Sequence, residues 1–238
     1  MNSPGQAAAV LILAVDTTTP GGSVALLENG ALLGEVNVES AATHSARLFR
    51  SIDFLAGAVG RDIRVVDGYA VAAGPGSFTG IRIGLGAVKS LAFASGRPVA
   101  PVSTLLALAE KLAADGAAPL VCPLLDAKKG EIYAALFEAR PDGLVEVLPQ
   151  GAYDPGAFFA RLPAGAAIAF AGSGLAAYGG ELEARVGSLA RFPRRSSFIA
   201  AEVGRLGAAL LAAGRGLDAA SLEPLYFRRS QAEEACRT

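Results

Sequence analysis

The segment Gly74-Pro-Gly-Ser-Phe-Thr-Gly80, which continues as Ile81-Arg-Ile-Gly84, stands between an apolar run and a helical pattern. Residues 69–73 before it are apolar throughout, which is typical of a strand buried on both faces. After it, apolar side chains recur at steps of four, three and four, at Ile81, Leu85, Val88 and Ala92. This period predicts a helix over residues 80–95. The segment is therefore a glycine-rich turn that leads from a buried strand into a helix.

The two ends of this helix carry the usual signals. Ser77 or Thr79 can cap its start, because a hydroxyl there accepts a hydrogen bond from a first-turn amide. Gly96 stands where the helix should end. Glycines permit a tight turn and close packing of the helix, so a structural role is assigned to Gly74, Gly76, Thr79 and Gly80.

A phosphate site is the alternative for this turn, since free amides and the helix dipole favour an anion. The dinucleotide-binding fingerprint, however, has two residues between its last two glycines and an acidic residue about 20 positions further on. Here three residues separate Gly76 from Gly80, and Pro98 stands near the acidic position. A Walker A loop needs lysine after the last glycine, where Ile81 stands. An oxidoreductase built on this turn is therefore only a third, weaker hypothesis.

The composition limits the class of protein. The chain has 238 residues, a net charge of -1, 52% hydrophobic residues and only 18% charged residues, where about 25% is usual. This surplus suggests that a partner covers part of the apolar surface, and the net charge gives no sign of nucleic-acid binding. Cys122 and Cys236 form no motif, and no signal peptide or membrane span is visible. We therefore expect a cytoplasmic protein without membrane contact.

One order of elements occurs twice along the chain. In each half a buried strand ends in aspartate, at Asp16 and Asp126, and a turn and a hairpin follow, with hairpin signals at 29–30 and 142–143. Each half then continues with a helix, a strand, a glycine turn and a helix; the first of these helices is expected over residues 43–59. The repeat predicts a duplicated α/β fold. Its parts are a flexible tail at 1–9, a first subdomain at 10–102, a second at 103–214 whose last helix can pack back on the first, and a C-terminal tail at 215–238.

Four segments, taken in order, closely resemble those of the TsaB (YeaZ) family. They read ILAVDTT from Ile12, GPGSFTGIRIG from Gly74, LDAKKGEIY from Leu125 and EPLYFRR from Glu223. The resemblance spans residues 10–230 and implies the actin–hexokinase–Hsp70 (ASKHA) fold, in which two α/β subdomains have mixed sheets flanked by helices. It also implies a non-catalytic scaffold subunit. Its complex would be the bacterial one that adds threonylcarbamoyl to the adenosine beside the anticodon of tRNAs reading codons that start with A.

The resemblance implies partners as well. A TsaD-like subunit would carry the metal and the transfer chemistry, a TsaC-like enzyme would make threonylcarbamoyl-adenylate, and a TsaE-like ATPase would join them. The isolated chain is expected to form a homodimer and to hold no cofactor. ATP or ADP with Mg would belong to the assembled complex, which would also provide most of the contact with tRNA.

Catalytic residues and metal ligands are not expected in this chain. Metal-bearing relatives, from which the older glycoprotease-like label came, place two histidines one helical turn apart. Here Leu48 stands four residues after His44, which is the only histidine. A serine nucleophile would have to use the same histidine, and Ser77 lacks the Gly-x-Ser-x-Gly elbow. The sequence therefore disfavours a metallopeptidase and a serine hydrolase.

An ATP-hydrolysing or phosphotransfer enzyme of the same fold is the second hypothesis. In that superfamily the turns after the first strand of each half hold nucleotide phosphates, and carboxylates and hydroxyls suit magnesium-bound phosphate. The alternative is that Asp16 and Thr18 only cap a tight turn. The candidate nucleotide cleft consists of Asp16, Thr17, Thr18, Asp126, Gly172 and Gly174, with Lys128 nearby.

The helices at 43–59 and 80–95 each carry two apolar rows, one more than a sheet can bury. Gly84 and Ala87 are small enough to let a partner helix approach. We therefore expect a helix-on-helix interface of roughly 1,200–2,000 Å² with the TsaD-like subunit, or with a second copy in its absence. The alternative is that both rows lie in a thicker core. The expected interface residues are Leu48, Phe49, Ile52, Leu55, Ile83, Gly84, Ala87 and Leu91.

Several arginines form small basic spots, and they suit either a solvated surface or contact with tRNA phosphates. Arg82 differs from them, because a cation in the first helical turn opposes the helix dipole. We expect it to have an acidic or anionic partner. The basic spots consist of Arg191, Arg194, Arg195, Arg228 and Arg229.

Overall fold

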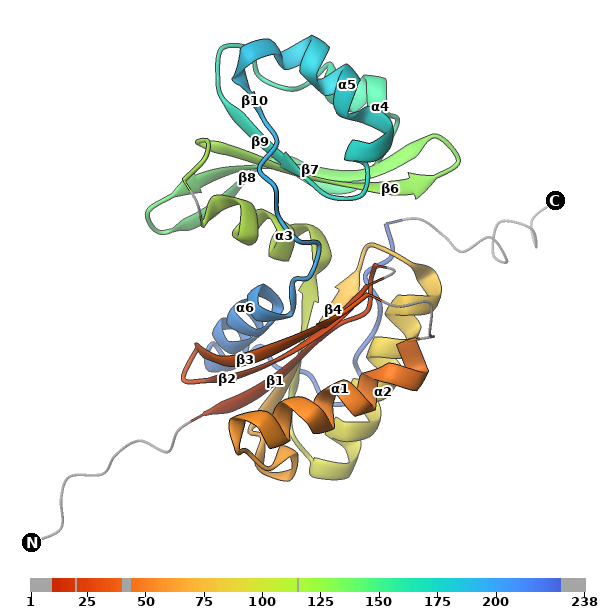
Figure 1. The fold of residues 1–238 in the computed structure, drawn as a ribbon, viewed down its shortest axis with the longest axis vertical. Coiled ribbons are helices and arrows are strands. Elements are labelled where there is room, and N and C mark those ends of the chain that lie inside the picture. The colour runs from red at the N-terminus through yellow and green to blue at the C-terminus, as the bar shows by residue number, and fades with distance from the viewer. Residues whose placement is uncertain (1–9, 20, 40–43, 115, 228–238) are drawn as a thin grey trace, which may run out of the picture.

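The computed structural model describes residues 10–19, 21–39, 44–114 and 116–227. The predicted N-terminal tail, Arg228 and Arg229 lie outside these ranges. The described chain contains two five-stranded sheets, each flanked by helices, one above the other in Figure 1. This confirms the predicted fold class.

The first sheet has the strand order β3-β2-β1-β4-β5. β1, β2 and β3 are antiparallel neighbours, whereas β1, β4 and β5 run parallel. β2 and β3 form a hairpin beside β1, whereas helices connect the parallel strands. The bounds are β1 Leu11–Asp16, β2 Gly22–Glu28, β3 Ala31–Val38, β4 Gly68–Gly74 and β5 Val99–Ser103.

The second sheet repeats this topology in the order β10-β9-β6-β7-β8. β6, β7 and β8 are antiparallel, and β6, β9 and β10 are parallel. β6 therefore occupies the central position that β1 has in the first sheet. The bounds are β6 Leu120–Lys128, β7 Glu131–Arg140, β8 Gly143–Tyr153, β9 Ile168–Ala171 and β10 Ala190–Arg191.

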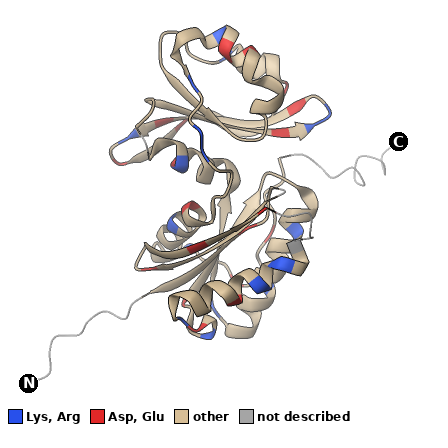
Figure 2. Ribbon diagram, in the orientation of Figure 1, with Lys and Arg blue, Asp and Glu red and all other residues tan. Residues whose placement is uncertain are grey.

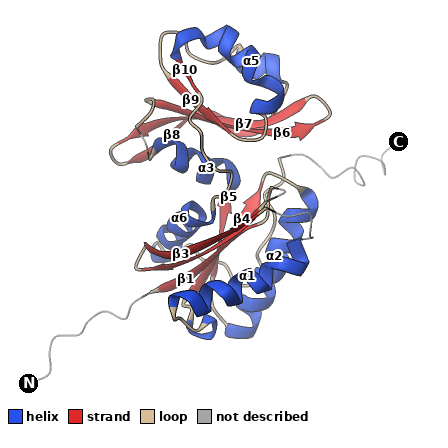
Figure 3. Ribbon diagram, in the orientation of Figure 1, coloured by secondary structure: helices blue, strands red, loops and turns tan. Residues whose placement is uncertain are grey.

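Helices and sheets alternate through the molecule (Figure 3). α1 (His44–Val59) and α2 (Phe78–Ser95) cover one face of the first sheet, and α6 (Ala200–Ala212) covers the other. α3 (Thr104–Ala113) packs on the second sheet and against α6, so these two helices lie between the sheets. α4 (Pro155–Phe159) and α5 (Leu175–Val186) lie on the outer side of the second sheet. We call the first sheet with α1, α2 and α6 the first lobe, and the second sheet with α3, α4 and α5 the second lobe.

The two faces of β1 belong to different cores. Leu13 and Val15 pack with α1 and α2, whereas Ile12 and Ala14 pack with α3 and α6. Every residue of β1 is buried, which explains why its sequence is apolar without alternation. α6 follows the second sheet in the chain but covers the first sheet. The sequence allowed this packing but did not decide it.

The glycine turn joins β4 to α2 as predicted. The Ser77 hydroxyl caps α2 by accepting a hydrogen bond from the Gly80 amide at 3.2 Å, and Gly96 ends the helix with φ at 66°. Thr79 is exposed and is not the cap. Within the described ranges, no helix combines the length and the hydropathy needed to cross a membrane.

Candidate functional site

Asp16 and Asp126 occupy equivalent places in the two sheets, near the ends of the central strands. Both carboxylates close the turn that follows. Oδ1 of Asp16 accepts hydrogen bonds from the amide and the hydroxyl of Thr18, at 2.8 and 2.7 Å. Oδ1 of Asp126 accepts one from the Lys128 amide at 2.8 Å, and its Oδ2 pairs with the Lys128 ammonium at 2.7 Å. Their first role is therefore to hold a turn.

The electrostatic surroundings of the two carboxyls differ. Asp16 is fully buried, and this desolvation raises its pKa to about 6, although the hydrogen bonds from Thr18 act in the opposite direction. Its Oδ2 has no hydrogen-bond partner within the described residues. Asp126 is half-buried, and the hydrogen bond from the Lys128 side chain holds its pKa below the usual range. The first lobe thus contains the more unusual carboxyl.

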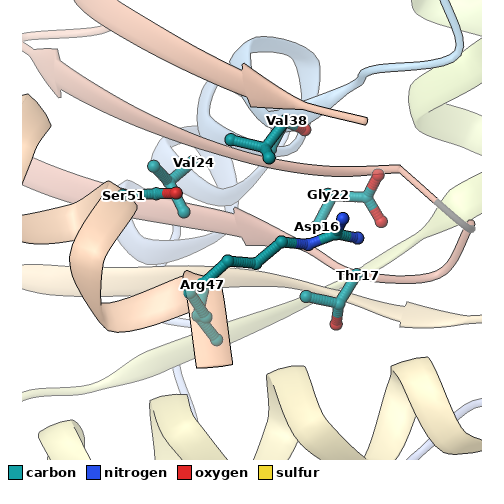
Figure 4. A pocket seen from close by; sticks show the side chains of 9 residues that line it. Asp16, Thr17, Gly22, Val24, Val38, Arg47 and Ser51 are labelled. Atoms are coloured by element: carbon teal, nitrogen blue, oxygen red, sulfur yellow. The ribbon is translucent and has the colours of Figure 1, made fainter. Parts of the chain in front are cut away.

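The space beside Asp16 is very small (Figure 4). The pocket has a volume of about 10 Å³, which is the size of one water molecule rather than of a phosphate group. In Figure 4 the Arg47 side chain reaches from α1 along this pocket toward Asp16. Its wall consists of Asp16, Thr17, Gly22, Ser23, Val24, Val38, Arg47, Leu48 and Ser51.

Thr17 and Thr18 are also buried, and their hydroxyls are used within the chain. Thr17 donates a hydrogen bond to the Gly80 carbonyl at 2.7 Å, and Thr18 donates to Asp16. The prediction that Asp16, Thr17 and Thr18 line an open nucleotide cleft is therefore corrected. Their donors and acceptors point into the fold because they hold the β1 turn against α2.

A larger pocket of about 330 Å³ lies between the lobes. It brings Gly172 of the second lobe together with Thr19 of the first, and none of the described residues in its wall is a carboxylate. Thr104, at the start of α3, is buried in this wall, and its hydroxyl has no partner within the described residues. Gly172 and Gly174 themselves serve the fold, because a Cβ on either would meet Leu124. The pocket has the size of a small-molecule site, but it does not join Asp16 to Asp126.

The helices α1 and α2 divide the predicted interface residues into two sets. Leu48, Ile52 and Leu55 are buried between α1 and the first sheet, so they are core residues and not available to a partner. Gly84 and Ala87 are buried as well; a Cβ on Gly84 would come within 2.4 Å of Thr17 Oγ1. These five positions are corrections, and the glycine admits the chain's own β1 turn rather than a partner helix.

The sequence analysis identified only some of the residues that reach the surface of these helices. Phe49 is exposed and Ile83 and Leu91 are half-buried, whereas Phe54 and Phe93 are 69% and 85% exposed. Gly86 lies on the same outward stripe of α2 as Ile83 and Phe93, at helical steps of three and seven. That period was readable in the sequence, but the choice of the buried row depended on the packing of α2 against Thr17.

Comparison with known proteins identifies the family. A family model described as TsaD, tRNA N6-adenosine threonylcarbamoyltransferase, matches residues 34–235. A protein named tRNA threonylcarbamoyladenosine biosynthesis protein TsaB, from Haemophilus influenzae, is 38% identical over 122 residues, 51% of either chain. The protein of that name from Escherichia coli is 32% identical over 133 residues, 56% of this chain and 57% of its own. The chain belongs to this family, and within it to the TsaB (YeaZ) proteins.

The chain spans about half the length of the curated TsaB relatives it matches. The solved structure of YeaZ from Pseudomonas aeruginosa is similar over most of the chain, with a TM-score of 0.79 and 29% identity, covering 91% of this chain and 99% of that one. A (R)-2-hydroxyglutaryl-CoA dehydratase component A from Acidaminococcus fermentans shares the fold alone, with a TM-score of 0.50 and 10% identity over 85% of this chain and 99% of its own.

The last of the TsaB-like segments runs beside the glycine turn. Leu222 is buried under α2, and the Leu225 amide donates a hydrogen bond to the Ala73 carbonyl at 2.8 Å. A Cβ on Gly74 would stand 2.6 Å from the Leu225 carbonyl oxygen, and one on Gly76 would stand 2.5 Å from that of Thr18. These glycines, both with positive φ, therefore make room for two neighbouring segments.

The arginines of the chain have mostly local contacts. Arg82 lies over the Phe78 ring, with 3.9 Å between its Cζ and the ring centroid, and donates to the Tyr226 hydroxyl at 3.3 Å. Its partners in the described chain are thus aromatic rather than acidic. Arg191 donates to the Ser188 carbonyl, and Arg195 belongs to the wall of the pocket between the lobes.

Proposed function

We propose that the chain is a scaffold subunit that binds and supports a TsaD-like catalytic subunit in the synthesis of threonylcarbamoyladenosine in tRNA. The names of its curated relatives support the pathway. The observation that carries the scaffold role is the exposed apolar surface on α1 and α2. Exposed phenylalanines on two neighbouring helices, Phe49 and Phe54 on α1 and Phe93 on α2, are typical of a surface that a partner covers.

The closed surroundings of Asp16 support a role without catalysis. A phosphotransfer site needs an open carboxylate that can hold a metal-bound phosphate. Here Asp16 is buried beside a space the size of one water molecule, and Thr17 and Thr18 donate to groups of the chain itself. The pocket between the lobes lacks a carboxylate in its wall. Of the two hypotheses, the scaffold therefore agrees better with the geometry than the ATP-hydrolysing enzyme does.

The proposed interface is the outward surface of α1 and α2, which pack side by side on the first sheet (Figure 1). It comprises Phe49, Phe54, Ile83, Gly86 and Phe93, where the exposed rings supply the apolar contact and the glycine lets a partner helix approach. We expect it to bury roughly 1,200–2,000 Å². The TsaD-like subunit would occupy it in the complex, and a second copy of this chain would occupy it otherwise. A TsaE-like ATPase, ATP or ADP with Mg, and most of the tRNA contact would belong to the assembly.

Depletion of the chain in its own organism tests this proposal. Nucleosides from total tRNA are separated by liquid chromatography and quantified by mass spectrometry, before and after depletion. We expect the threonylcarbamoyladenosine content to fall several-fold and to recover on expression of the wild-type chain. A tagged copy should purify together with the TsaD-like subunit. Unchanged threonylcarbamoyladenosine after complete depletion would contradict the proposal.

A further inference from the structure

Three side chains near the glycine turn form a layered surface cluster, which we call the aromatic–arginine stack: Phe78, Arg82 and Tyr226. The Phe78 and Tyr226 rings are stacked, with centroids 5.4 Å apart and planes at 23°. The guanidinium of Arg82 covers the Phe78 ring and also donates to the Tyr226 hydroxyl. Both rings remain about two-fifths exposed, at 39% and 40%. Flat, ordered rings that keep this much exposure are able to accept another flat group.

A second aromatic pair extends this surface to the other lobe. The ring of Phe227, which follows Tyr226 in the chain, lies 6.5 Å from the ring of Tyr133 on β7. The backbone hydrogen bond from Leu225 to Ala73 fixes the segment that carries both C-terminal rings. Contacts with both lobes and with the end of β4 therefore hold the rings in place. An additional base or ring that binds here would meet a surface that is already ordered.

One cation, Arg82, belongs to this surface. Among the described residues, no carboxylate lies within ion-pair distance of Arg82, and its only hydrogen bond goes to Tyr226. The turn between β6 and β7 carries Lys128 and Lys129, but the Lys128 ammonium pairs with Asp126 at 2.7 Å, and Figure 2 shows both basic and acidic positions at this turn. A guanidinium that has no carboxylate partner among the described residues and lies beside stacked rings is suited to a polyanion that also carries planar bases.

We infer that the aromatic–arginine stack, with Tyr133 and Phe227, is a platform on which unpaired bases of single-stranded RNA stack. Proteins recognise single-stranded loops of RNA in this way, through aromatic side chains and guanidinium planes. Arg82 is the cation that would neutralise a phosphate of such a loop. The inference rests on the proposed function, because that function supplies the RNA: a tRNA whose reacting adenosine lies in the single-stranded anticodon loop.

The test measures binding of a fluorescein-labelled RNA hairpin that carries the anticodon loop of a tRNA reading a codon that starts with A. Fluorescence anisotropy is recorded with the full chain, alone and together with the TsaD-like subunit. Tyr226→Ala removes one ring, and Arg82→Lys keeps the charge but removes the planar stack. We expect either substitution to weaken binding about 10-fold. Thermal denaturation of each variant confirms that it is folded.

Two matched substitutions in the second lobe serve as controls. Phe192 is 39% exposed and stacked on Phe170 at 5.7 Å, and Arg161 lies over the Tyr153 ring. Phe192→Ala and Arg161→Lys should leave RNA affinity unchanged. The same loss of affinity in these controls would show a general charge or surface effect and would overturn the platform.

Other results separate the platform from the proposed function. If Tyr226→Ala and Arg82→Lys bind RNA like the wild type, or if the wild type does not bind the hairpin even with the TsaD-like subunit, the platform is wrong while the scaffold proposal stands. If they weaken binding of the TsaD-like subunit and not of RNA, the surface is a protein interface and the inference fails. Failure of the scaffold proposal would instead be seen as an unchanged threonylcarbamoyladenosine content after depletion.

Discussion

The side chain of Thr17 lies directly against Gly84, so that a Cβ on this glycine would come within 2.4 Å of Thr17 Oγ1. The same threonine donates a hydrogen bond to the Gly80 carbonyl, one turn earlier in α2. The turn after β1 is thus pressed onto the start of α2. This contact explains why glycine stands at positions 80 and 84 of α2.

Replacing Gly84 should therefore destabilise the fold. Gly84→Ala places a methyl group against the Thr17 hydroxyl, and we expect a loss of roughly 1–3 kcal/mol in the free energy of unfolding, measured by urea denaturation. Gly86 is the matched control, because a Cβ there meets nothing within 4 Å. Gly86→Ala should stabilise the helix by roughly 0.5–1 kcal/mol. Equal effects of the two substitutions would show that the contact with Thr17 is unimportant.

The proposed interface gives a second prediction for the same helix. Gly86→Arg fits the isolated chain without a clash, so the variant should fold as stably as the wild type. It would, however, place a long charged side chain in the centre of the interface. Size-exclusion chromatography with light scattering should then show a monomer, and the TsaD-like subunit should no longer purify with it.

Gly180→Arg is the control for this substitution. Gly180 also lies within a helix, α5, and a Cβ there also meets nothing within 4 Å, but it belongs to the second lobe. This variant should associate like the wild type. A folded Gly86→Arg protein that still binds its partner would exclude this surface.

Asp16 predicts a dependence of stability on pH. Its pKa is raised to about 6 in the folded chain from an ordinary value of 3.8, because burial disfavours the carboxylate. The folded state thus binds the proton more tightly, so stability is greatest below the ordinary pKa and falls as pH rises toward about 6, by up to about 3 kcal/mol. Asp16→Asn keeps an oxygen that can accept from Thr18 but has no charge. Urea denaturation of the two proteins from pH 4 to pH 7, about the range of this titration, should show the fall only in the wild type.

ATP turnover distinguishes the two functional hypotheses. We expect the isolated chain to hydrolyse ATP with Mg no faster than the Asp16→Ala variant does, since the carboxylate and both neighbouring hydroxyls are used within the fold. Phosphate release is measured with a coupled colour assay on freshly purified protein. A magnesium-dependent rate that disappears in the variant would instead support the enzyme.

Local sequence signals were sufficient to predict the helices and strands but not which face of each is buried. The hydroxyl of Ser77 and the glycine at 96 act through neighbours in the chain, so the ends of α2 could be predicted. The burial of Gly84 depends on Thr17, a residue 67 positions earlier, and no period in α2 contains that information. The path of the C-terminal segment beside Ala73 depends on long-range contacts, among them the Leu225–Ala73 hydrogen bond and the stacking of Tyr226 on Phe78, and its position was therefore not predicted.

The candidate site shows the same limit. Asp16 and Thr18 were identified because they stand at the end of a predicted strand. A turn cap and a phosphate ligand both require this position, so the position alone does not distinguish the two roles. The choice between them depends on the volume left beside the carboxylate, which is set by Arg47 and Leu48 on α1. A sequence does not contain such a volume until the helices are packed.

The position of α6 has a consequence for how the protein is made. Residues of β1 such as Ile12 and Ala14 pack with α6, which the ribosome produces long after β5. At usual rates of translation the part of the first sheet that α6 covers stays without that helix for on the order of 10 seconds after the last strand has been synthesised. A nascent chain that stops before α6 is therefore an open apolar sheet and a substrate for chaperones and proteases. The lobe that begins the sequence is the one that the growing chain completes last.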